Sequence, residues 1–461
     1  MRAEDAPADA PVFDRTSADA TAAAPGAGRG APATRPDLQP GAHAGPPPEA
    51  RADLPAQARS DAPSAGPADP AAKLPAGLPG TAGWGRRDRD PGRFQFATLV
   101  VPLLLFVATR VVQLLLMTWM DGPDDTVRGK LLAWDAGFFV RMIRGGYPSG
   151  FSYDTNGTMI GNELAFFPGY PMVARLVHLA GVEATTAALI VGWITGALAA
   201  MAVYALGAEL YDRRVGLMLS LLFCTQPMSV VLSMAYSEAL FVSLTAAALV
   251  AAHRRAWIYA GLFAMAAGLT RPTGAAIAVA ILFAAVVYLA DGGERRWRAL
   301  AGACLALSGV PAYLLWVGQR VGAWDAWFQI QTAGWNTTFD FGISTFKFVR
   351  DALRAGDAWV ELSVAWLLLA ALVAAGVAVA RKVWPPLIIY GVIVLVLVLG
   401  QSGFYHSKPR LLVPALLILV PAAVALARTR RTSTAVLALV GFAGFGLWYG
   451  SYLLTVWPYA I

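Results

Sequence analysis

Charged residues and cysteine are both scarce in this chain. Only 14% of its 461 residues are charged, against about 25% in an ordinary soluble domain. Its two cysteines, Cys224 and Cys304, lie inside apolar runs, so neither a disulfide framework nor a cysteine-based metal site is expected. The sequence also lacks a phosphate-binding glycine loop, a dinucleotide fingerprint and a cluster of His and Cys. No motif therefore predicts a nucleotide or metal cofactor.

The first 92 residues have almost no large apolar side chains. Segments such as 6–11 and 45–55 consist mostly of Ala, Pro, Gly and charged residues. Such a composition buries too little surface to offset the entropy lost on ordering. No apolar stretch of the kind found in signal peptides follows Met1. We predict a disordered cytoplasmic tail over residues 1–92, followed by one membrane domain over residues 93–461.

Apolar sequence, by contrast, is abundant: 57% of the residues are hydrophobic. Crossing a bilayer core of about 30 Å takes roughly 20 residues of helix. Apolar runs suited to this occur at 95–119, 184–207, 215–233, 238–252, 256–270, 273–290, 299–318, 359–380, 383–401, 410–427 and 433–455. They predict an all-α polytopic membrane protein with about 10–11 transmembrane helices. The helix count between 215 and 290 stays open, because those runs are short.

Basic residues gather at alternate gaps between these runs. Arg86, Arg87, Arg89 and Arg93 precede the first run, which predicts a cytoplasmic N-terminus because Lys and Arg are enriched on that side. The later basic gaps hold Arg213–Arg214, His253–Arg255, Arg295–Arg298, Arg381–Lys382 and Arg428–Arg431. The long segments 120–183 and 319–358 are then predicted on the opposite side. The net charge of +7 is explained as a topology signal, and no nucleic-acid partner is expected.

Two carboxylates of the first outer segment stand in apolar surroundings. Asp135 lies within Ala-Trp-Asp-Ala-Gly-Phe-Phe, where partial desolvation would favour a role as a general base. The alternative is that Asp135 caps a short helix beginning at Ala136. Glu163 precedes Phe166-Phe167-Pro168, and it too is either a substrate contact or a helix-start carboxylate.

Cationic side chains occur near the predicted outer ends of helices. Arg271 lies in Thr-Arg-Pro-Thr-Gly between two runs, a depth at which a guanidinium is costly unless it is paired. It can bind a lipid phosphate in a bidentate manner or pair with Glu238, which opens a nearby run. His406, Lys408 and Arg410 precede another run; they either bind phosphate or simply reach the membrane surface.

Aromatic and amide side chains occur together in the second outer segment. Gln331 and Trp335 belong to this stretch, which begins with Trp324 and Trp327. Flat rings beside amides suit a sugar ring, and they suit an interfacial anchor equally well. The candidate substrate-binding residues are Trp134, Glu163, Glu238, Gln331 and Trp335.

Several short motifs occur in a fixed order across residues 95–455. They are Trp134-Asp135 with Gly146-Tyr147, Phe166-Phe167-Pro168 with Tyr170-Pro171, Ser237-Glu238, Thr270-Arg271-Pro-Thr-Gly274 and Pro409-Arg410-Leu-Leu-Val-Pro414. In this order they resemble the PIG-V-like mannosyltransferase family, relatives of GPI mannosyltransferase 2 with the GT-C fold. The resemblance implies an inverting transferase that moves a sugar, most readily mannose, from a polyprenyl-phosphate donor on the non-cytoplasmic face.

The resemblance also assigns roles to individual residues. Asp135 matches the family's general base in the first outer loop, and the acceptor would be a glycolipid or a glycan. Cationic groups would stabilise the leaving lipid phosphate, and the candidates are Arg271, His406, Lys408 and Arg410. No divalent metal is expected, because such a donor carries a single phosphate.

Two other classes of function are compatible with a polytopic chain. A transporter or flippase of lipid-linked sugars should concentrate polar residues near the middle of the membrane. Here the polar residues gather in outer loops and at helix ends, which favours an enzyme at the membrane surface. A scaffold for envelope assembly, with the tail as its docking segment, is the third possibility.

Overall fold

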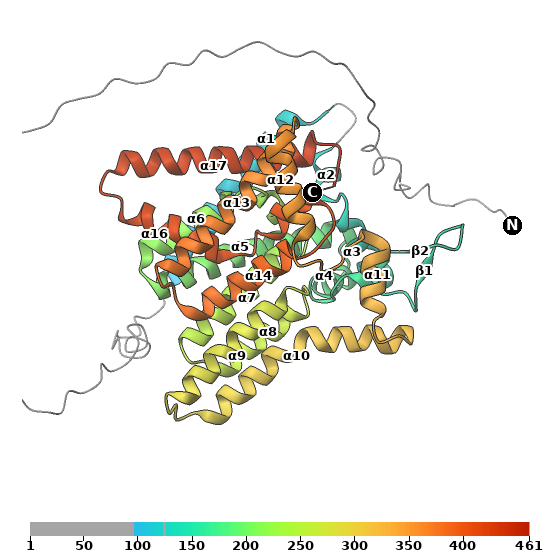
Figure 1. The fold of residues 1–461 in the computed structure, drawn as a ribbon, viewed down its shortest axis with the longest axis horizontal. Coiled ribbons are helices and arrows are strands. Elements are labelled where there is room, and N and C mark those ends of the chain that lie inside the picture. Colours follow the sequence, from blue (N-terminus) through green and yellow to red (C-terminus); the bar gives the residue numbers. More distant parts are fainter. Residues whose placement is uncertain (1–95, 123–125, 461) are drawn as a thin grey trace, which may run out of the picture. The chain divides into compact units, whose positions relative to one another are not determined.

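The computed structural model describes residues 96–122 and 126–460, and these residues are almost entirely helical (Figure 1). The predicted tail, together with Asp124 and Asp125, lies outside them. One short antiparallel hairpin interrupts the helices, in which β1 (Ser152–Tyr153) pairs with β2 (Met159–Ile160). The predicted class, an all-α chain with several apolar spans, is confirmed.

Five of the described helices are long and apolar enough to cross a membrane. They are α1 (Val100–Met120), α5 (Ala184–Leu210), α10 (Arg296–Val321), α13 (Trp359–Ala380) and α17 (Thr432–Thr455). The segments Tyr405–Leu411 and Leu416–Arg428 form a sixth span if their bend of 76° is accepted. Four shorter apolar helices accompany them: α7 (Glu238–His253), α8 (Trp257–Gly268), α9 (Gly274–Ala290) and α14 (Pro385–Leu399). The predicted count of ten or eleven membrane helices is reached only if the bent pair and these shorter helices are counted together with the five long ones.

Two predicted runs are broken at prolines. The run at 215–233 contains α6 (Arg213–Thr225), then Pro227, and then the 3₁₀ helix η4 (Ser229–Leu232). The run at 410–427 contains the end of α15 (Lys408–Leu411), Pro414, η6 (Leu416–Leu419) and α16 (Val420–Arg428). Proline has no N–H and disfavours the helical conformation in the residue before it. Continuous hydropathy therefore does not mean a continuous helix here.

Arg110, a charged residue inside the first apolar run, stabilises one of these breaks. Arg110 of α1 is fully buried. Its guanidinium donates to the carbonyl oxygens of Cys224 and Ser229, with Nη1 2.6 Å from Ser229 O. A buried charge needs such partners, and these two carbonyls flank the break between α6 and η4. Arg110 thus joins α1 to both sides of the break between α6 and η4.

The two predicted outer segments contact each other through α11. The first holds α2 (Val127–Leu131), α3 (Asp135–Gly145), η3 (Glu163–Ala165) and α4 (Gly169–Leu179); the second holds α11 (Ala326–Trp335) and α12 (Ile343–Ala355). The remaining short helices are η2 (Phe96–Leu99) and η5 (Tyr405–Ser407). The carbonyl of Ala165 accepts from Trp327 Nε1 at 3.1 Å and from Gln331 Nε2 at 2.9 Å. Consequently α11 is fastened to η3 and lies beside the first segment in Figure 1, whereas α12 packs against α13.

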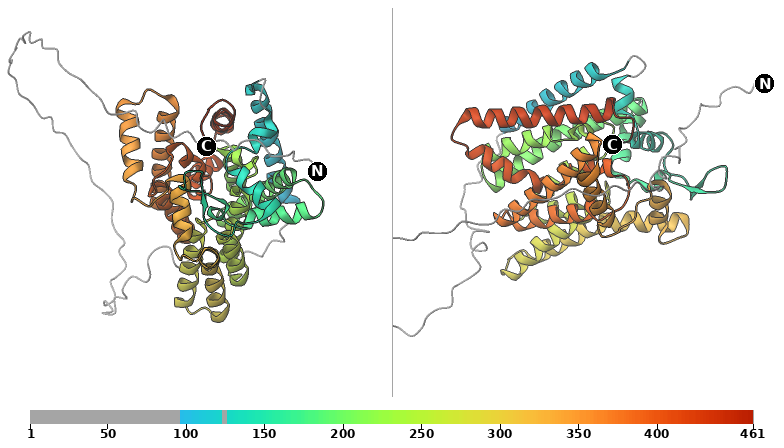
Figure 2. Two further views of the ribbon diagram at one scale, coloured as in Figure 1. Left: turned by 90° about the vertical axis from the view of Figure 1, so that its right-hand side faces the viewer. Right: turned by 45° about the horizontal axis from the view of Figure 1, so that its top comes forward.

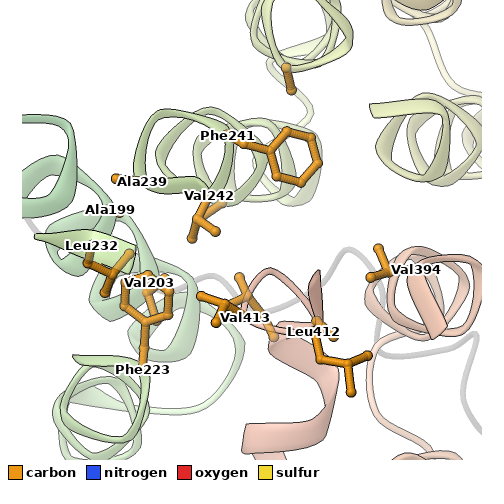
Figure 3. Close-up of a cluster of buried hydrophobic side chains, with 14 of the residues drawn as sticks. Ala199, Val203, Phe223, Leu232, Ala239, Phe241, Val242, Val394, Leu412 and Val413 are labelled. Carbon is orange, nitrogen blue, oxygen red and sulfur yellow. The ribbon is translucent and has the colours of Figure 1, made fainter. Parts of the chain in front are cut away.

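The core lies where α5, α6, α7 and α14 meet the bent pair of segments Tyr405–Leu411 and Leu416–Arg428, called the broken span below. Figure 3 shows these side chains pointing toward one another, among them Val203, Phe223, Phe241, Val394 and Val413. Helices α8, α9 and α10 lie side by side in Figures 1 and 2. A Cβ atom on Gly261 of α8 would come within 2.3 Å of Gly302 O on α10. Glycine at this crossing lets the two backbones approach closely, as small residues do in membrane helix pairs.

Candidate functional site

Asp135, the first residue of α3, forms an ion pair with Arg410 of α15. The carboxylate oxygen Oδ2 accepts a hydrogen bond from Arg410 Nη1 at 2.8 Å. The side chains are 21% and 11% exposed, respectively. The fold therefore brings together two residues that are 275 positions apart: the first outer segment meets the start of the broken span.

Glu238, the first residue of α7, extends this pair. Its carboxylate is 2% exposed, and Oε1 lies 2.9 Å from Arg271 Nη1. The same oxygen lies 3.8 Å from Arg410 Nε. Arg271 Nη1 also donates to Ser237 Oγ at 3.0 Å. Asp135, Arg410, Glu238 and Arg271 thus form a continuous series of opposite charges, named here the charge array.

The charge array is balanced in charge but not in hydrogen bonds. Two carboxylates face two guanidinium groups, as buried ions require. Within the described residues, however, three of its buried atoms have no hydrogen-bond partner, namely Glu238 Oε2, Arg271 Nε and Arg410 Nε. Unpaired buried polar atoms are uncommon and call for an explanation. Two of the three are N–H donors of arginine, so the array can still donate to an additional anionic oxygen.

Local sequence explains how Arg271 reaches the array. It lies in the tight connection between α8 and α9, where its backbone N–H donates to Ala267 O at 3.1 Å. A Cβ atom on Gly274 would come within 2.4 Å of Gly268 Cα. The glycine of Thr-Arg-Pro-Thr-Gly is therefore needed for the two helices to approach. The motif builds a sharp hairpin whose arginine points at Glu238.

Tyr236 contacts the charge array from its buried side. The sequence analysis did not identify it as a site residue. It is fully buried, and its ring centre lies 5.1 Å from Arg410 Cζ, within the range of a cation–π contact. Its hydroxyl accepts a hydrogen bond from the backbone N–H of Asp135 at 3.3 Å. The only signal in the sequence was its position two residues before Glu238.

The other two predicted phosphate-binding cations have different surroundings. Lys408 is buried, and its ammonium donates to Val398 O at 3.1 Å and to Gln401 O at 2.7 Å. His406 is also buried, with its ring beside those of Phe404 and Tyr405. Of the three cations predicted together, Arg410 joins the array, whereas Lys408 binds the carbonyl end of α14.

Replacing Lys408 by Met should therefore act mainly on stability. The substitution leaves two carbonyl oxygens without their charged donor, and such hydrogen bonds contribute about 1.5–3 kcal/mol each. We expect a lower melting temperature of the purified protein, with the KM for the sugar donor that the family resemblance implies unchanged in the molecules that remain folded. Lys347→Met, on the exposed face of α12, is the matched control and should melt like the wild type. A donor KM that rises in Lys408→Met at unchanged stability would show instead that Lys408 binds the donor.

Glu163, Gln331 and Trp335 lie in or beside an aromatic cluster next to the array. Glu163 pairs with Arg141 at 2.5 Å. Trp335 lies 5.4 Å from the ring of Phe138 and 5.2 Å from that of Phe166. Phe138 comes three residues after Asp135 on α3, so the two share one face of that helix. The cluster is therefore about one helical turn from the carboxylate. Gln331, fastened to Ala165 as described above, holds the cluster in place.

Tyr147, part of the predicted Gly-Tyr motif, supports the same region. Its hydroxyl donates to Phe166 O at 2.8 Å. Burial raises the pKa of Tyr147 well above its usual range, so the side chain stays a neutral donor. A tyrosine in this state fixes the backbone of the Phe-Phe-Pro turn. In the part of the chain that the structure describes, no three His, Cys, Asp or Glu side chains gather as metal ligands would.

The fold and the charge array define a multi-pass membrane protein with a buried acid–arginine site where several helix ends meet. Residues 120–289 match the model of a family described as mannosyltransferase (PIG-V). GPI alpha-1,6-mannosyltransferase 2 of Mus musculus is 36% identical over 160 residues, which are 32% of this chain and 30% of that protein. The Homo sapiens protein is 33% identical over 162 residues, 32% of this chain and 31% of its own.

The predicted resemblance is thus confirmed over residues 120–289, and the matches span less than a third of these relatives' length. Among solved structures, ArnT from Cupriavidus metallidurans bound to undecaprenyl phosphate aligns with a TM-score of 0.46 and 18% identity, over 74% of this chain and 63% of that one. The Archaeoglobus fulgidus oligosaccharyltransferase aligns with a TM-score of 0.40 and 16% identity, over 78% and 52%.

Proposed function

We propose that this protein is a membrane mannosyltransferase that uses a polyprenyl-phosphate-mannose donor. The observation that carries the proposal is the charge array, which sets a carboxylate and two guanidinium groups in one series of contacts. Asp135, Glu238 and Arg271 all fall within the segment that matches the mannosyltransferase family. The array offers both groups that the reaction needs, a base for the acceptor and cations for the departing phosphate.

The proposed reaction is a direct displacement at the anomeric carbon. Asp135 removes the proton of an acceptor hydroxyl while the hydroxyl oxygen forms a bond to that carbon. The bond between the anomeric carbon and the donor phosphate breaks, and its electron pair leaves with the phosphate oxygen. The single charge of the donor phosphate becomes two on the lipid phosphate product. A one-step attack from the opposite side inverts the anomeric configuration.

Arg410 and Arg271 are the groups that would hold this growing negative charge. A guanidinium matches two phosphate oxygens with a rigid pair of N–H donors. The Nε atoms of both arginines lack partners among the described residues, so each can add a bond to phosphate. Lys408 is already engaged with two carbonyl oxygens, and we leave it out of the phosphate site.

The ion pair between Asp135 and Arg410 gives the two substrates an order. Arg410 Nη1 lies 2.8 Å from Oδ2 of Asp135, so one oxygen of the carboxylate is engaged before any substrate binds. A donor phosphate that draws hydrogen bonds from Arg410 would loosen this pair and free that oxygen for the acceptor hydroxyl. Donor binding thereby prepares Asp135 for the acceptor, which we propose to be a glycolipid or a glycan.

We further propose that the site faces the non-cytoplasmic side, with the N-terminus in the cytoplasm. The basic gaps at Arg213–Arg214, Arg381–Lys382 and Arg428–Arg431 support this orientation through the cytoplasmic enrichment of Lys and Arg. Glu238 begins α7 and Arg271 follows α8, whereas the basic gap His253–Arg255 lies at the other ends of these two helices. The lipid bilayer is then both the solvent of the protein and the source of its donor.

The proposal is tested with purified protein in lipid vesicles, radiolabelled donors and a glycolipid acceptor fraction. We expect label to move from polyprenyl-phosphate-mannose and not from GDP-mannose, at equal rates with and without a chelator. Transfer only from the nucleotide sugar would refute the donor assignment. Activity that is lost with chelator and restored by a divalent ion would refute the metal-free mechanism. Vesicles that carry the lipid-linked sugar across the membrane without any transfer would favour the flippase alternative.

A further inference from the structure

The backbone bends sharply just before Asp135. Trp134 has φ 60° and ψ −120°, and the N–H of Ala136 donates to Ala133 O at 3.3 Å. These are the dihedral angles of the first central residue of a type II′ turn, a place that glycine normally fills because φ is positive. A bulky residue in this conformation is strained. Strain of this kind persists only where the surroundings impose it.

Packing does not explain why tryptophan is kept at this glycine position. Trp134 is 39% exposed and is not part of the buried core. Among the described residues it has no ring partner and no hydrogen bond, unlike Trp335 with its two aromatic neighbours. The side chain that causes the strain is therefore presented to the surroundings, one residue before Asp135.

Tyr236 holds the turn closed from the buried side. Its hydroxyl accepts from Asp135 N at 3.3 Å and donates to Ala133 O at 3.4 Å, so it bridges the two residues that flank Trp134. The neighbouring N–H of Ala235 donates to Leu131 O at 3.1 Å. Both hydroxyl contacts are long for hydrogen bonds, but together they fix the turn at both of its ends.

We propose that Tyr236 is a positioning residue that stabilises the strained turn, and that the turn serves to hold the Trp134 indole beside Asp135 as a flat surface for a hexose ring. The hydroxyl of Tyr236 sets the direction of α3 and hence of the carboxylate, while its ring supports Arg410. The apolar face of a sugar ring packs on an exposed aromatic plane. This inference rests on the proposed sugar-transfer function and adds a residue that contacts the sugar and one that places the base.

The strain is tested by comparing two variants that both lack the indole. At ordinary positions alanine is more stable than glycine; Ala370→Gly on the exposed side of α13 is the control and should lower the melting temperature. At position 134 we expect the reverse order, with Trp134→Gly melting about 1–4 °C above Trp134→Ala. If Trp134→Ala is the more stable of the two, the turn is not strained and the inference is wrong.

The sugar contact is tested with the same pair in the transfer assay. Both variants should lose about tenfold in kcat/KM for the sugar donor, a loss typical of one aromatic contact. Trp134→Phe, which keeps a flat ring, should stay within about threefold of the wild type. Full activity in both Trp134→Gly and Trp134→Ala would remove the indole from the site.

The role of Tyr236 is tested by combining substitutions. Tyr236→Phe should lower kcat several-fold with an unchanged donor KM, because the hydroxyl places Asp135 without touching the substrate. In a Trp134→Gly background the same change should have little further effect, because an unstrained turn does not need the Tyr236 hydroxyl to hold it. Tyr449→Phe is the control, since Tyr449 is equally buried and its hydroxyl contacts Ser363 at 3.0 Å.

Equal effects of Tyr236→Phe in both backgrounds would show that the hydroxyl does not act through the turn. The melting temperatures test the strained turn even if the protein transfers no sugar. Failure of this inference can thus be told apart from failure of the proposed function.

Discussion

Asp135→Asn is expected to reduce mannosyl transfer by about 10²–10⁴-fold, the range that a general base contributes. The amide keeps the size of the side chain and can still accept a hydrogen bond from Arg410, but it cannot take a proton from the acceptor. The measurement is the initial rate of transfer from polyprenyl-phosphate-mannose, at protein levels matched by immunoblot. Binding of polyprenyl phosphate should persist in the variant, because Arg271 and Arg410 remain.

A matched control for this substitution exists on α12. Asp351 is also an aspartate paired with an arginine, lying 2.7 Å from Arg350, but both side chains are exposed. Asp351→Asn should transfer sugar at the wild-type rate. If Asp135→Asn also keeps that rate, Asp135 is not the base, and Glu163 becomes the next carboxylate to test.

Arg410→Gln should impair both folding stability and transfer. Removing one partner of a buried ion pair costs about 3–5 kcal/mol, and the partial exposure of the Asp135 side chain puts this pair at the lower end of that range. The loss of a cation beside the departing phosphate should reduce kcat by about 10²–10³-fold. Thermal melting and transfer kinetics are measured on the same preparation.

Two further variants separate these effects. Arg350→Gln removes an exposed arginine of the same kind of pair, which contributes at most about 1 kcal/mol, and should leave both properties unchanged. Arg410→Lys keeps the charge but not the paired donors, so it should recover stability better than transfer. Equal recovery of both properties would mean that Arg410 acts only through its charge balance with Asp135 and Glu238.

Much of this site follows from chemistry that is visible in the sequence. A guanidinium at the depth of Arg271 requires a partner, and the sequence offered a lipid phosphate or Glu238. The structure pairs Arg271 with Glu238 at 2.9 Å. The carboxylate of Asp135, surrounded by aromatic residues, was singled out for the same reason. Charges in apolar segments are costly, so each one carries information about contacts or function.

The remainder depends on contacts between distant segments. The sequence grouped His406, Lys408 and Arg410 because they are neighbours, but the turn from η5 into α15 directs Lys408 to α14 and Arg410 to Asp135. Hydropathy cannot distinguish these directions, since it records composition and not which way a side chain points. Hydropathy also could not show that Trp134 has a backbone conformation typical of glycine, because it does not depend on backbone angles.

Apolar runs in the sequence also do not show where a helix is interrupted. The apolar runs at 215–233 and 410–427 satisfy the length rule for a span, yet each contains a proline and folds as separate pieces. Breaks of this kind are tolerated in membranes where other groups satisfy the exposed carbonyls. Arg110 supplies such a group at the first break, and at the second the hydroxyl of Tyr390 on α14 donates to Pro414 O at 2.8 Å.

The most direct test of this account is a cryo-electron microscopy structure of the full chain in a lipid nanodisc with polyprenyl phosphate bound. The account predicts that the phosphate lies within hydrogen-bond distance of Arg410 and Arg271, with the contact between Arg410 and Asp135 lengthened from 2.8 Å. A phosphate bound elsewhere, with the charge array unchanged, would contradict the assignment of the array as the donor site.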